Sequence, residues 1–478
     1  MLGLVERYLA RIEAYDRRGP SLNSLITVNP KALERAASLD RAFRESGPTG
    51  PLHGIPVIVK DNYDTADLPT TAGSLALLDS VPPDDAFQVR RLREAGAIVL
   101  AKSNMAEWAF SPYETVGSAL PGYSRNPYDT RRVTAGSSGG TGAAVAANLG
   151  VVGLGTDTGN SIRGPSSHNA LVGIRSTMGL TSRDGIVPLY LDHDIGGPMA
   201  RTVADAVAIF EVIAGHDSAD PVTAAASEHG QGSYRTFLDP DGLQGARIGV
   251  VRQLTRDGEI DPEVLARFDE ALNDLRGAGA TVVDPVDIPE LDSIPRDARW
   301  CPRFQHDLNG YLASLGDGAP VKNLQEVFDS GRFHPSVRGG IEFFLGIDGA
   351  PEDLEICREA WSNGKLLAAG VRRALGAADL DALVYPTWSY PPRLIGDLNT
   401  PAGDNSQDLS PHTGFPAITV PMGWVRTADL EPGLPVGLQI LGDAWSEPTL
   451  IRLAYAYEQA TGHRQPPSTT PRLTASPP

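Results

Sequence analysis

The chain has few cysteines and few positive charges for its length. Among 478 residues there are only two cysteines, Cys301 and Cys357, too few for a disulfide framework or a four-ligand zinc site. The 59 acidic residues outnumber the 41 Lys and Arg, which leaves a net charge of −18 at pH 7. Because phosphate backbones are bound by clustered Lys and Arg, this balance argues against a nucleic-acid partner. The sequence also predicts no bound metal and no other cofactor.

Long apolar runs are missing as well. No stretch reaches the roughly 18 apolar residues that a transmembrane helix needs. The first residues place Leu4, Tyr8, Leu9, Ile12 and Tyr15 at helical spacing between charged residues. This is an amphipathic helix and not a signal peptide, so we expect no membrane partner. Together with the scarcity of cysteine, it favours a reducing cytoplasm.

Helices and strands alternate along the rest of the chain. A short apolar strand over 55–59 ends directly before Lys60, and a helix closed by Gly96 precedes a strand over 97–101. A second unit of the same kind spans 246–288, and late strands are expected within 381–387, 415–421 and 434–441. A final helix begins after Ser446 as N-cap and ends at Gly462. The alternation predicts an α/β fold.

We expect a single domain over 1–465 and a disordered Pro- and Thr-rich tail over 466–478. Between about 290 and 375 the pattern is less regular and richer in aromatics, which is typical of a variable, substrate-side region. Seven aromatic residues, most of them from this region, are candidates for an apolar substrate pocket: Trp108, Phe110, Trp300, Phe304, Tyr311, Phe343 and Phe344.

The stretch 133–168 is crowded with Gly, Ser and Thr and carries only two charged residues, Asp157 and Arg163. It does not fit phosphate binding, because no Lys follows its glycines as a Walker loop requires. The run GLGTDTG has the wrong spacing for a dinucleotide fingerprint. A hydroxyl nucleophile is the reading that remains, since glycines free backbone amides and hydroxyls among them can attack or carry protons.

Two nucleophile schemes compete. Gly136 to Gly140 satisfies G-x-S-x-G with Ser138 at its centre, and His412 or His463 would then serve as base. The residues before it, NPYDTRRVTA, make a poor buried strand, which counts against this nucleophile elbow. The other scheme uses a lysine base. Lys60 is suited to it because burial at the end of an apolar strand would lower its pKa.

The chain resembles the amidase signature family through three motifs in order: GIPVIVKDN around Lys60, AGSSGGTGAAVAA around Ser137, and GLGTDTGNSIRGPSSHNALVGIRSTMGL around Ser161. The resemblance continues through GPMARTVADA and GLPVGLQILG, so it covers nearly the whole chain. It implies the amidase signature fold, a large mixed central sheet with helices on both faces. It also implies an amidase that hydrolyses linear amide C–N bonds.

Carried over residue by residue, the resemblance implies Ser161 as nucleophile, Ser137 as a bridging serine held by a cis peptide, and Lys60 as base. Backbone amides of Thr158, Gly159, Asn160 and Ser161 would form the oxyanion hole. We expect Ser138 to support Ser137 or Lys60 by hydrogen bonding. Asp157 and Arg163 are expected to pair and to hold the loop.

This chain departs from the family's commonest pattern at one point. Asn160 stands directly before the nucleophile where most members have glycine, which leaves substrate preference open. The aromatics and the acidic surface favour a neutral, hydrophobic or aryl amide, with carbamates and esters as further candidates. The alternative activity is that of the glutamine-dependent tRNA amidotransferase subunit, which needs partner proteins. Otherwise we expect a small-molecule substrate and a monomer or homodimer.

Overall fold

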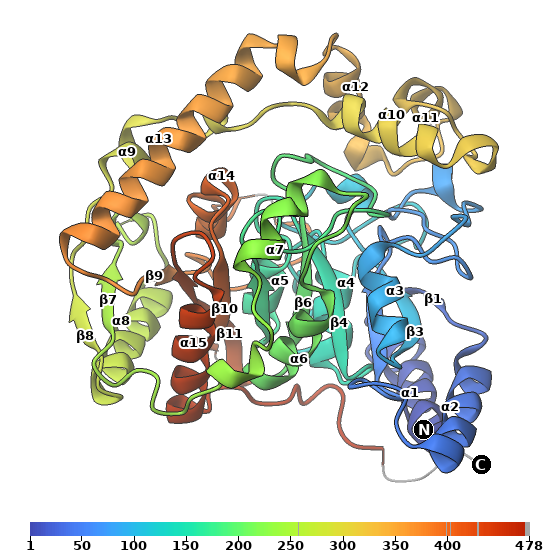
Figure 1. The fold of residues 1–478 in the computed structure, drawn as a ribbon, viewed down its shortest axis with the longest axis horizontal. Coiled ribbons are helices and arrows are strands. Elements are labelled where there is room, and N and C mark those ends of the chain that lie inside the picture. Colours follow the sequence, from blue (N-terminus) through green and yellow to red (C-terminus); the bar gives the residue numbers. More distant parts are fainter. Residues whose placement is uncertain (257, 398, 402, 428–429, 474–478) are drawn as a thin grey trace.

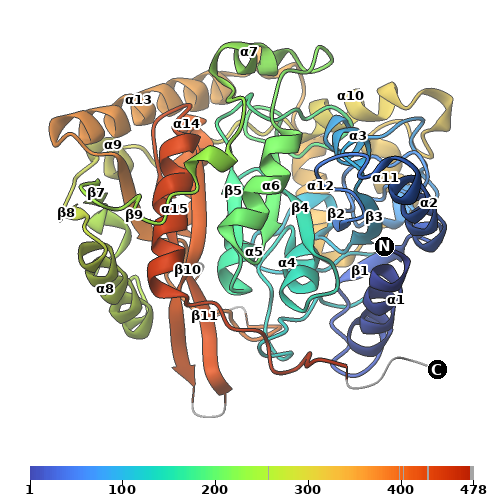
Figure 2. The ribbon, with the colours of Figure 1, turned by 60° about the horizontal axis from the view of Figure 1, so that its bottom comes forward.

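The computed structural model describes residues 1–256, 258–397, 399–401, 403–427 and 430–473. Within these residues, one mixed sheet of eleven strands has the order β1-β3-β2-β4-β6-β5-β10-β11-β9-β7-β8. Helices lie on both sides of this sheet, as Figures 1 and 2 show. The predicted α/β fold with a large, helix-covered central sheet is therefore confirmed.

Most of the predicted elements are present, with boundaries shifted by a few residues. The strands are β1 (Leu25–Val28), β2 (Pro56–Lys60), β3 (Ile98–Ser103), β4 (Val152–Asp157), β5 (Val172–Arg175), β6 (Ile195–Ala200), β7 (Arg247–Val250), β8 (Thr281–Val283), β9 (Ala382–Pro386), β10 (Ala417–Thr427) and β11 (Leu430–Leu441). The helices are α1 (Leu2–Arg11), α2 (Ala32–Ser46), α3 (Phe87–Glu94), α4 (Gly139–Ala146), α5 (Arg163–His168), α6 (Val203–Ile213), α7 (Ala226–His229), α8 (Pro262–Gly277), α9 (Pro289–Ser293), α10 (Phe304–Ser314), α11 (Leu324–Ser330), α12 (Arg338–Leu345), α13 (Glu355–Ala377), α14 (Ser410–Thr413) and α15 (Glu447–Thr461).

Strand β2 is buried on both faces, which decides where Lys60 points. Val57 and Val59 pack into the core shared with α3, α6, α8 and α15. Ile58 packs into the opposite core, which contains residues of α1, α2 and α4. Because side chains alternate along a strand, Lys60 lies on the same side as Ile58. The last residue of β2 is thereby directed toward the N-terminal end of α4.

Helix α4 lies very close to β4 because β4 contains glycines. A Cβ atom at Gly153 would lie 2.4 Å from Cγ2 of Thr141, and one at Gly155 would lie 2.9 Å from Oγ of Ser138. The first two glycines of GLGTDTG therefore allow close packing of the helix on the sheet. This contact brings the Ser137–Ser138 turn against the end of β4.

Helices α10 to α13 form an arch across the top of Figure 1. The arch is tied together by a disulfide between Cys301, just before α10, and Cys357 in α13. From the sequence we expected no disulfide framework, and this single bond was not anticipated, because only the fold brings together residues that are 56 positions apart. The cysteine count consequently no longer supports a reducing compartment.

Two smaller expectations are also corrected. The tail over 466–473 is packed and not disordered: Tyr15 donates to the carbonyl of Pro471 over 2.7 Å, and Thr470 is buried. Residues 474–478 lie outside the described part of the chain. Ser446 precedes α15 as expected but makes no capping hydrogen bond, whereas Gly462 ends the helix in the left-handed conformation.

In the described chain, no helix is both long enough and apolar enough to cross a membrane.

Candidate active site

Lys60 and Ser137 meet where β2 ends against the turn that leads into α4. The Nζ atom of Lys60 lies 2.7 Å from Oγ of Ser137 and 2.7 Å from Oγ1 of Thr156. Both Lys60 and Ser137 have 0% exposed surface. Burial lowers the pKa of Lys60 to about 7, although the carboxylates of Asp194 and Asp157 oppose the shift. Lys60 can therefore be neutral near physiological pH, as a base must be.

The turn that presents Ser137 has almost no free space. A Cβ atom at Gly136 would lie 2.4 Å from the carbonyl oxygen of Ser111 and 2.5 Å from that of Glu114, so only glycine fits there. The Gly136–Ser137 peptide bond is cis, as the family resemblance implies. This packing holds the Ser137 backbone beside Lys60.

Ser138 supports the site by a route that the sequence did not suggest. Its hydroxyl donates to the carbonyl oxygen of Thr156 over 3.1 Å, and the Thr156 amide donates back to it over 3.3 Å. The partner is thus the backbone of Thr156, not Ser137 or Lys60 themselves. Since Thr156 contacts the Lys60 ammonium, Ser138 positions that group indirectly.

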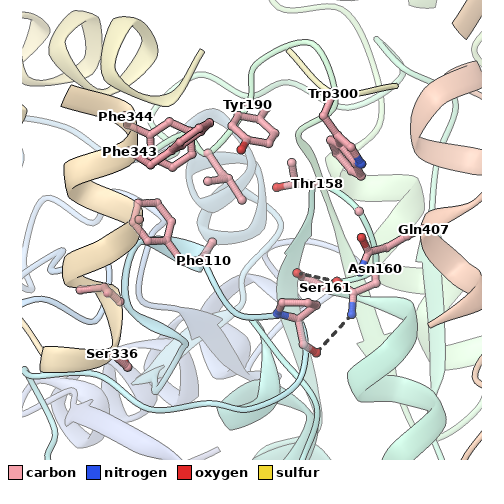
Figure 3. A pocket seen from close by; sticks show the side chains of 16 residues that line it. Phe110, Thr158, Asn160, Ser161, Tyr190, Trp300, Ser336, Phe343, Phe344 and Gln407 are labelled. Atoms are coloured by element: carbon pink, nitrogen blue, oxygen red, sulfur yellow. Dashed lines mark hydrogen bonds between the residues drawn. The ribbon is translucent and has the colours of Figure 1, made fainter. Parts of the chain in front are cut away.

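Ser161 lies in the loop between β4 and α5, on the wall of a cavity of about 510 Å³. Its hydroxyl donates to Oδ1 of Asn160 over 3.2 Å rather than to Ser137. The Asn160 side-chain nitrogen in turn donates to the carbonyl oxygens of Pro112 and Gly136, over 3.3 and 3.2 Å. Figure 3 shows Ser161 and Asn160 side by side at this wall. The side chain of Asn160 therefore connects the backbone before Ser137 with the hydroxyl of Ser161.

The loop before Ser161 offers unused backbone donors. The amides of Ile162 and Arg163 both donate to the Asp157 carboxylate. Within the described chain, the amides of residues 158–161 have no hydrogen-bond partner. All four residues line the cavity. Such donors can stabilise an oxyanion that develops next to Ser161.

A buried ion cluster supports this loop from behind. Asp157 pairs with Arg163 over 3.0 Å and with Arg175 over 3.1 Å, and none of the three side chains is exposed. Burial by itself raises the pKa of Asp157, but the two guanidinium groups outweigh it and lower the pKa to about 2. The expected Asp157–Arg163 pair is present. Arg175 was missed, and its place at the end of the buried strand β5 was the signal available for it.

Asp194 is a second buried carboxylate, one that no motif in the sequence pointed to. It accepts hydrogen bonds from the hydroxyl of Thr158 and from the amide of Leu189, over 2.5 and 2.8 Å. Both of these residues line the cavity. Burial raises the pKa of Asp194 to about 6. Asp194 thus links two walls of the cavity and adds negative charge near Lys60.

The cavity wall opposite Ser161 is aromatic. Four of the seven candidate pocket residues line the cavity: Phe110, Trp300, Phe343 and Phe344. Tyr190 and the aliphatic Leu189 line it as well. No charged side chain lines the cavity among the described residues.

Three candidates lie elsewhere. Trp108 and Phe304 are buried in the core below the wall, and Tyr311 packs against that core and donates to Asp64 over 2.8 Å. Spacing along the chain could not separate wall residues from the core residues behind them.

The histidines required by the nucleophile-elbow scheme are not beside Ser138. His463 contacts Asp274 over 3.3 Å, and the ring of His412 packs on Trp300 with 4.6 Å between ring centroids. No strand directly precedes Ser138, because β3 ends at Ser103. The structure therefore favours the lysine scheme. The described residues also contain no group of three or more His, Cys, Asp and Glu that could hold a metal.

Known proteins are similar to this chain over nearly its whole length. The family model described as Amidase matches residues 3–451. A relative from Arabidopsis thaliana, named Probable amidase, is 36% identical over 97% of this chain and 87% of its own length. A glutamyl-tRNA(Gln) amidotransferase subunit of Symbiobacterium thermophilum is 35% identical over 97% of this chain and 94% of its own. Among solved structures, the peptide amidase of Stenotrophomonas maltophilia has a TM-score of 0.86 and 39% identity, covering 98% of this chain and 95% of that one.

Proposed function

Because this chain belongs to the amidase family and is a hydrolase of amide C–N bonds, we propose that Ser161, Ser137 and Lys60 carry out the cleavage. The observation that carries the assignment is the 2.7 Å contact between Lys60 Nζ and Ser137 Oγ, sealed from solvent beside the cavity that contains Ser161. A buried lysine with a pKa of about 7 that contacts the hydroxyls of Ser137 and Thr156 is suited to act as a general base.

In the proposed reaction, neutral Lys60 takes the proton of Ser137 while Ser137 takes the proton of Ser161. The Ser161 oxygen attacks the carbonyl carbon and forms a tetrahedral oxyanion. The relay then runs in reverse, so that the leaving amine receives a proton as the C–N bond breaks. Water hydrolyses the resulting acyl-enzyme by the same relay. For the first step, Ser161 must turn its proton from Asn160 to Ser137 when substrate binds.

The unpartnered amides of residues 158–161 would bind the oxyanion. Donors of this kind contribute about 3 kcal/mol each to transition-state stabilisation when they are held rigidly. Here the rigidity comes from Asp157, which accepts hydrogen bonds from the amides of Ile162 and Arg163. Asp157 is also paired with the side chains of Arg163 and Arg175. We assign Thr158, Gly159, Asn160 and Ser161 to this hole, and Asp157 and Arg163 to its support. Ser138 is assigned to the support of Lys60, through the backbone of Thr156.

The substrate is a small amide, and we infer that its acyl group is neutral and apolar or aromatic. Four aromatic side chains from separate segments, Phe110, Tyr190, Trp300 and Phe344, face the cavity. A charged acyl group would find no charged partner on the described lining, and burying it unpaired would be unfavourable. Amides of peptides that end in an apolar residue fit the same description.

The amidotransferase subunits among the relatives raise a second candidate, the release of ammonia from glutamine for a partner protein. Free glutamine carries an α-carboxylate and an α-ammonium group, and a binding site must pair both. The described lining of this cavity has no charged side chain for either group. The geometry therefore favours hydrolysis of neutral amides over glutamine-dependent transfer.

The proposed function is tested by measuring ammonia or amine release by the isolated protein. The panel contains 3-phenylpropanamide, an aryl anilide, a dipeptide amide, an aryl carbamate and glutamine. We expect turnover of the apolar amides and none of glutamine. Glutamine turnover without any apolar amide being cleaved would overturn the proposal.

A further inference from the structure

The cavity wall next to the nucleophile loop contains a second carboxamide, that of Gln407. This residue ends the short turn Asn405–Gln407 and lines the cavity together with Ser161. A Cβ atom at Gly159 would lie only 3.2 Å from Cγ of Gln407, so Gln407 packs directly against the proposed oxyanion loop. Figure 3 shows it beside Asn160 at the edge of the cavity.

The orientation of the Gln407 carboxamide follows from its partner. Nε2 of Gln407 donates to Oδ2 of Asp404 over 2.6 Å, and Asp404 is buried. Above the Asp404 pKa of about 7, the reverse orientation would place the carboxamide oxygen against an ionised carboxylate oxygen, which repels it. Oε1 of Gln407 must therefore point away from Asp404.

The support of this pair is rigid. The other Asp404 oxygen accepts from the hydroxyl and the amide of Ser406, over 2.5 and 3.2 Å. The carbonyl oxygen of Ser406 accepts from Arg163 over 2.8 Å. Arg163 is the same residue that pairs with Asp157 under the nucleophile loop. Gln407 and Ser161 are consequently positioned by one connected network.

Oε1 of Gln407 is an acceptor that the protein itself does not use. It has no hydrogen-bond partner within the described chain, and it is not among the buried atoms sealed off from solvent. Two other polar side chains of the wall are already engaged. Thr158 donates to Asp194, and the Asn160 carboxamide contacts Ser161, Pro112 and Gly136.

We propose that Gln407 is a specificity-determining residue, whose Oε1 accepts a hydrogen bond from an N–H group of the substrate. This inference rests on the proposed function of the same site. An acceptor held in place cannot bind the scissile carbonyl oxygen or an ester oxygen, because both are acceptors too. Gln407 therefore selects compounds with an N–H next to the scissile carbonyl. The N–H comes either from the leaving amide nitrogen or from an acylamino group on the acyl side.

Four substrates separate these sources: 3-phenylpropanamide, N-acetylphenylalaninamide and the methyl ester of each acyl group. The test variant is Gln407→Met, which keeps the length of the side chain and removes the acceptor. The matched control is Gln325→Met, because Gln325 makes a similar bond to Asp329 over 2.9 Å on the exposed face of α11. Assays are run at pH 8.5, where Lys60 and Asp404, each with a pKa of about 7, are deprotonated.

We expect kcat/KM of Gln407→Met to fall roughly 10- to 100-fold for the substrates whose N–H donates to Oε1 of Gln407 in the wild-type protein. If kcat/KM falls for both amides and for neither ester, the N–H that Gln407 binds is that of the leaving amide nitrogen. If kcat/KM falls for N-acetylphenylalaninamide and for its methyl ester, the N–H is that of the acylamino group. The ester of 3-phenylpropanoic acid carries no N–H and should be cleaved at the wild-type rate, which also shows that the variant is folded.

A second variant, Asp404→Asn, removes the charge that orients Gln407. It should lower kcat/KM for the same substrates, but to a smaller extent. Equal loss for all four substrates, or unchanged kcat/KM for all four, would overturn the role of Gln407. Failure of the wild-type protein to cleave either amide would instead overturn the proposed function.

Discussion

Lys60 Nζ lies 2.7 Å from Ser137 Oγ, and neither side chain is reached by solvent. The contact joins the end of β2 to a turn that lies far along the chain. It places a base with a pKa of about 7 next to the hydroxyl of a closely packed turn. The first two predictions follow from this pair.

Replacement of the proposed nucleophile should abolish turnover. We expect Ser161→Ala to be inactive, and Ser137→Ala and Lys60→Ala to lose on the order of 10⁴-fold in kcat, as relay members do. The melting temperature should change little for the two serine variants. His463→Ala is the control, because His463 contacts Asp274 and does not line the cavity. Activity retained in Ser161→Ala, together with complete loss in Ser138→Ala, would support the nucleophile elbow instead.

Activity should depend on pH through Lys60. The pKa of Lys60 is lowered from its usual value to about 7, so the neutral, active form dominates above pH 7. We expect kcat/KM to rise with pH, to be half-maximal near pH 7 and to level off roughly one pH unit higher. The rise should be absent in the residual activity of Lys60→Ala. A wild-type profile that is flat between pH 5 and 9 would contradict the assigned base.

The aromatic wall should control the size of the acyl group. Trp300→Ala removes a large ring that lines the cavity, so KM for 3-phenylpropanamide should rise about tenfold. KM for acetamide, which does not reach the wall, should stay the same. Phe43→Ala is a suitable control because Phe43 is 52% exposed on α2. Equal effects on the two amides would remove Trp300 from the substrate pocket.

The disulfide should stabilise the arch. Closing a loop across 56 residues restricts the unfolded chain, so Cys301→Ser with Cys357→Ser should lower the free energy of unfolding by up to about 4 kcal/mol. KM should rise as well, because Trp300 directly precedes Cys301. Urea unfolding of the double variant measures the first effect, with reduced wild-type protein as reference. Identical unfolding midpoints before and after reduction would refute the prediction.

Chelation should leave the enzyme unaffected. The proposed chemistry uses a lysine base and backbone donors, and no step in it requires a metal ion. We expect equal rates in EDTA and in buffer after prolonged dialysis. A loss of activity that zinc or manganese restores would show that the mechanism is incomplete.

Much of the site could be anticipated because its residues lie within short, distinctive stretches. Lys60 follows an apolar strand, and Ser137 and Ser161 lie among glycines. The Asp157–Arg163 pair was also expected, because these are the only charges of their segment. Local patterns were less informative for the pocket, since Trp108 and Phe110 are neighbours and yet only Phe110 reaches the cavity.

The fold class, the family and the residues proposed for catalysis could all be read from the amino-acid sequence, because periodicity and motif spacing are local properties of the chain. Relationships between distant segments emerged only in the folded molecule. Folding paired Cys301 with Cys357, placed Arg175 behind the loop and brought Gln407 to the cavity that Ser161 lines. These relationships arise because separate elements pack against one sheet. A local sequence pattern contains no information on which distant segments will be neighbours.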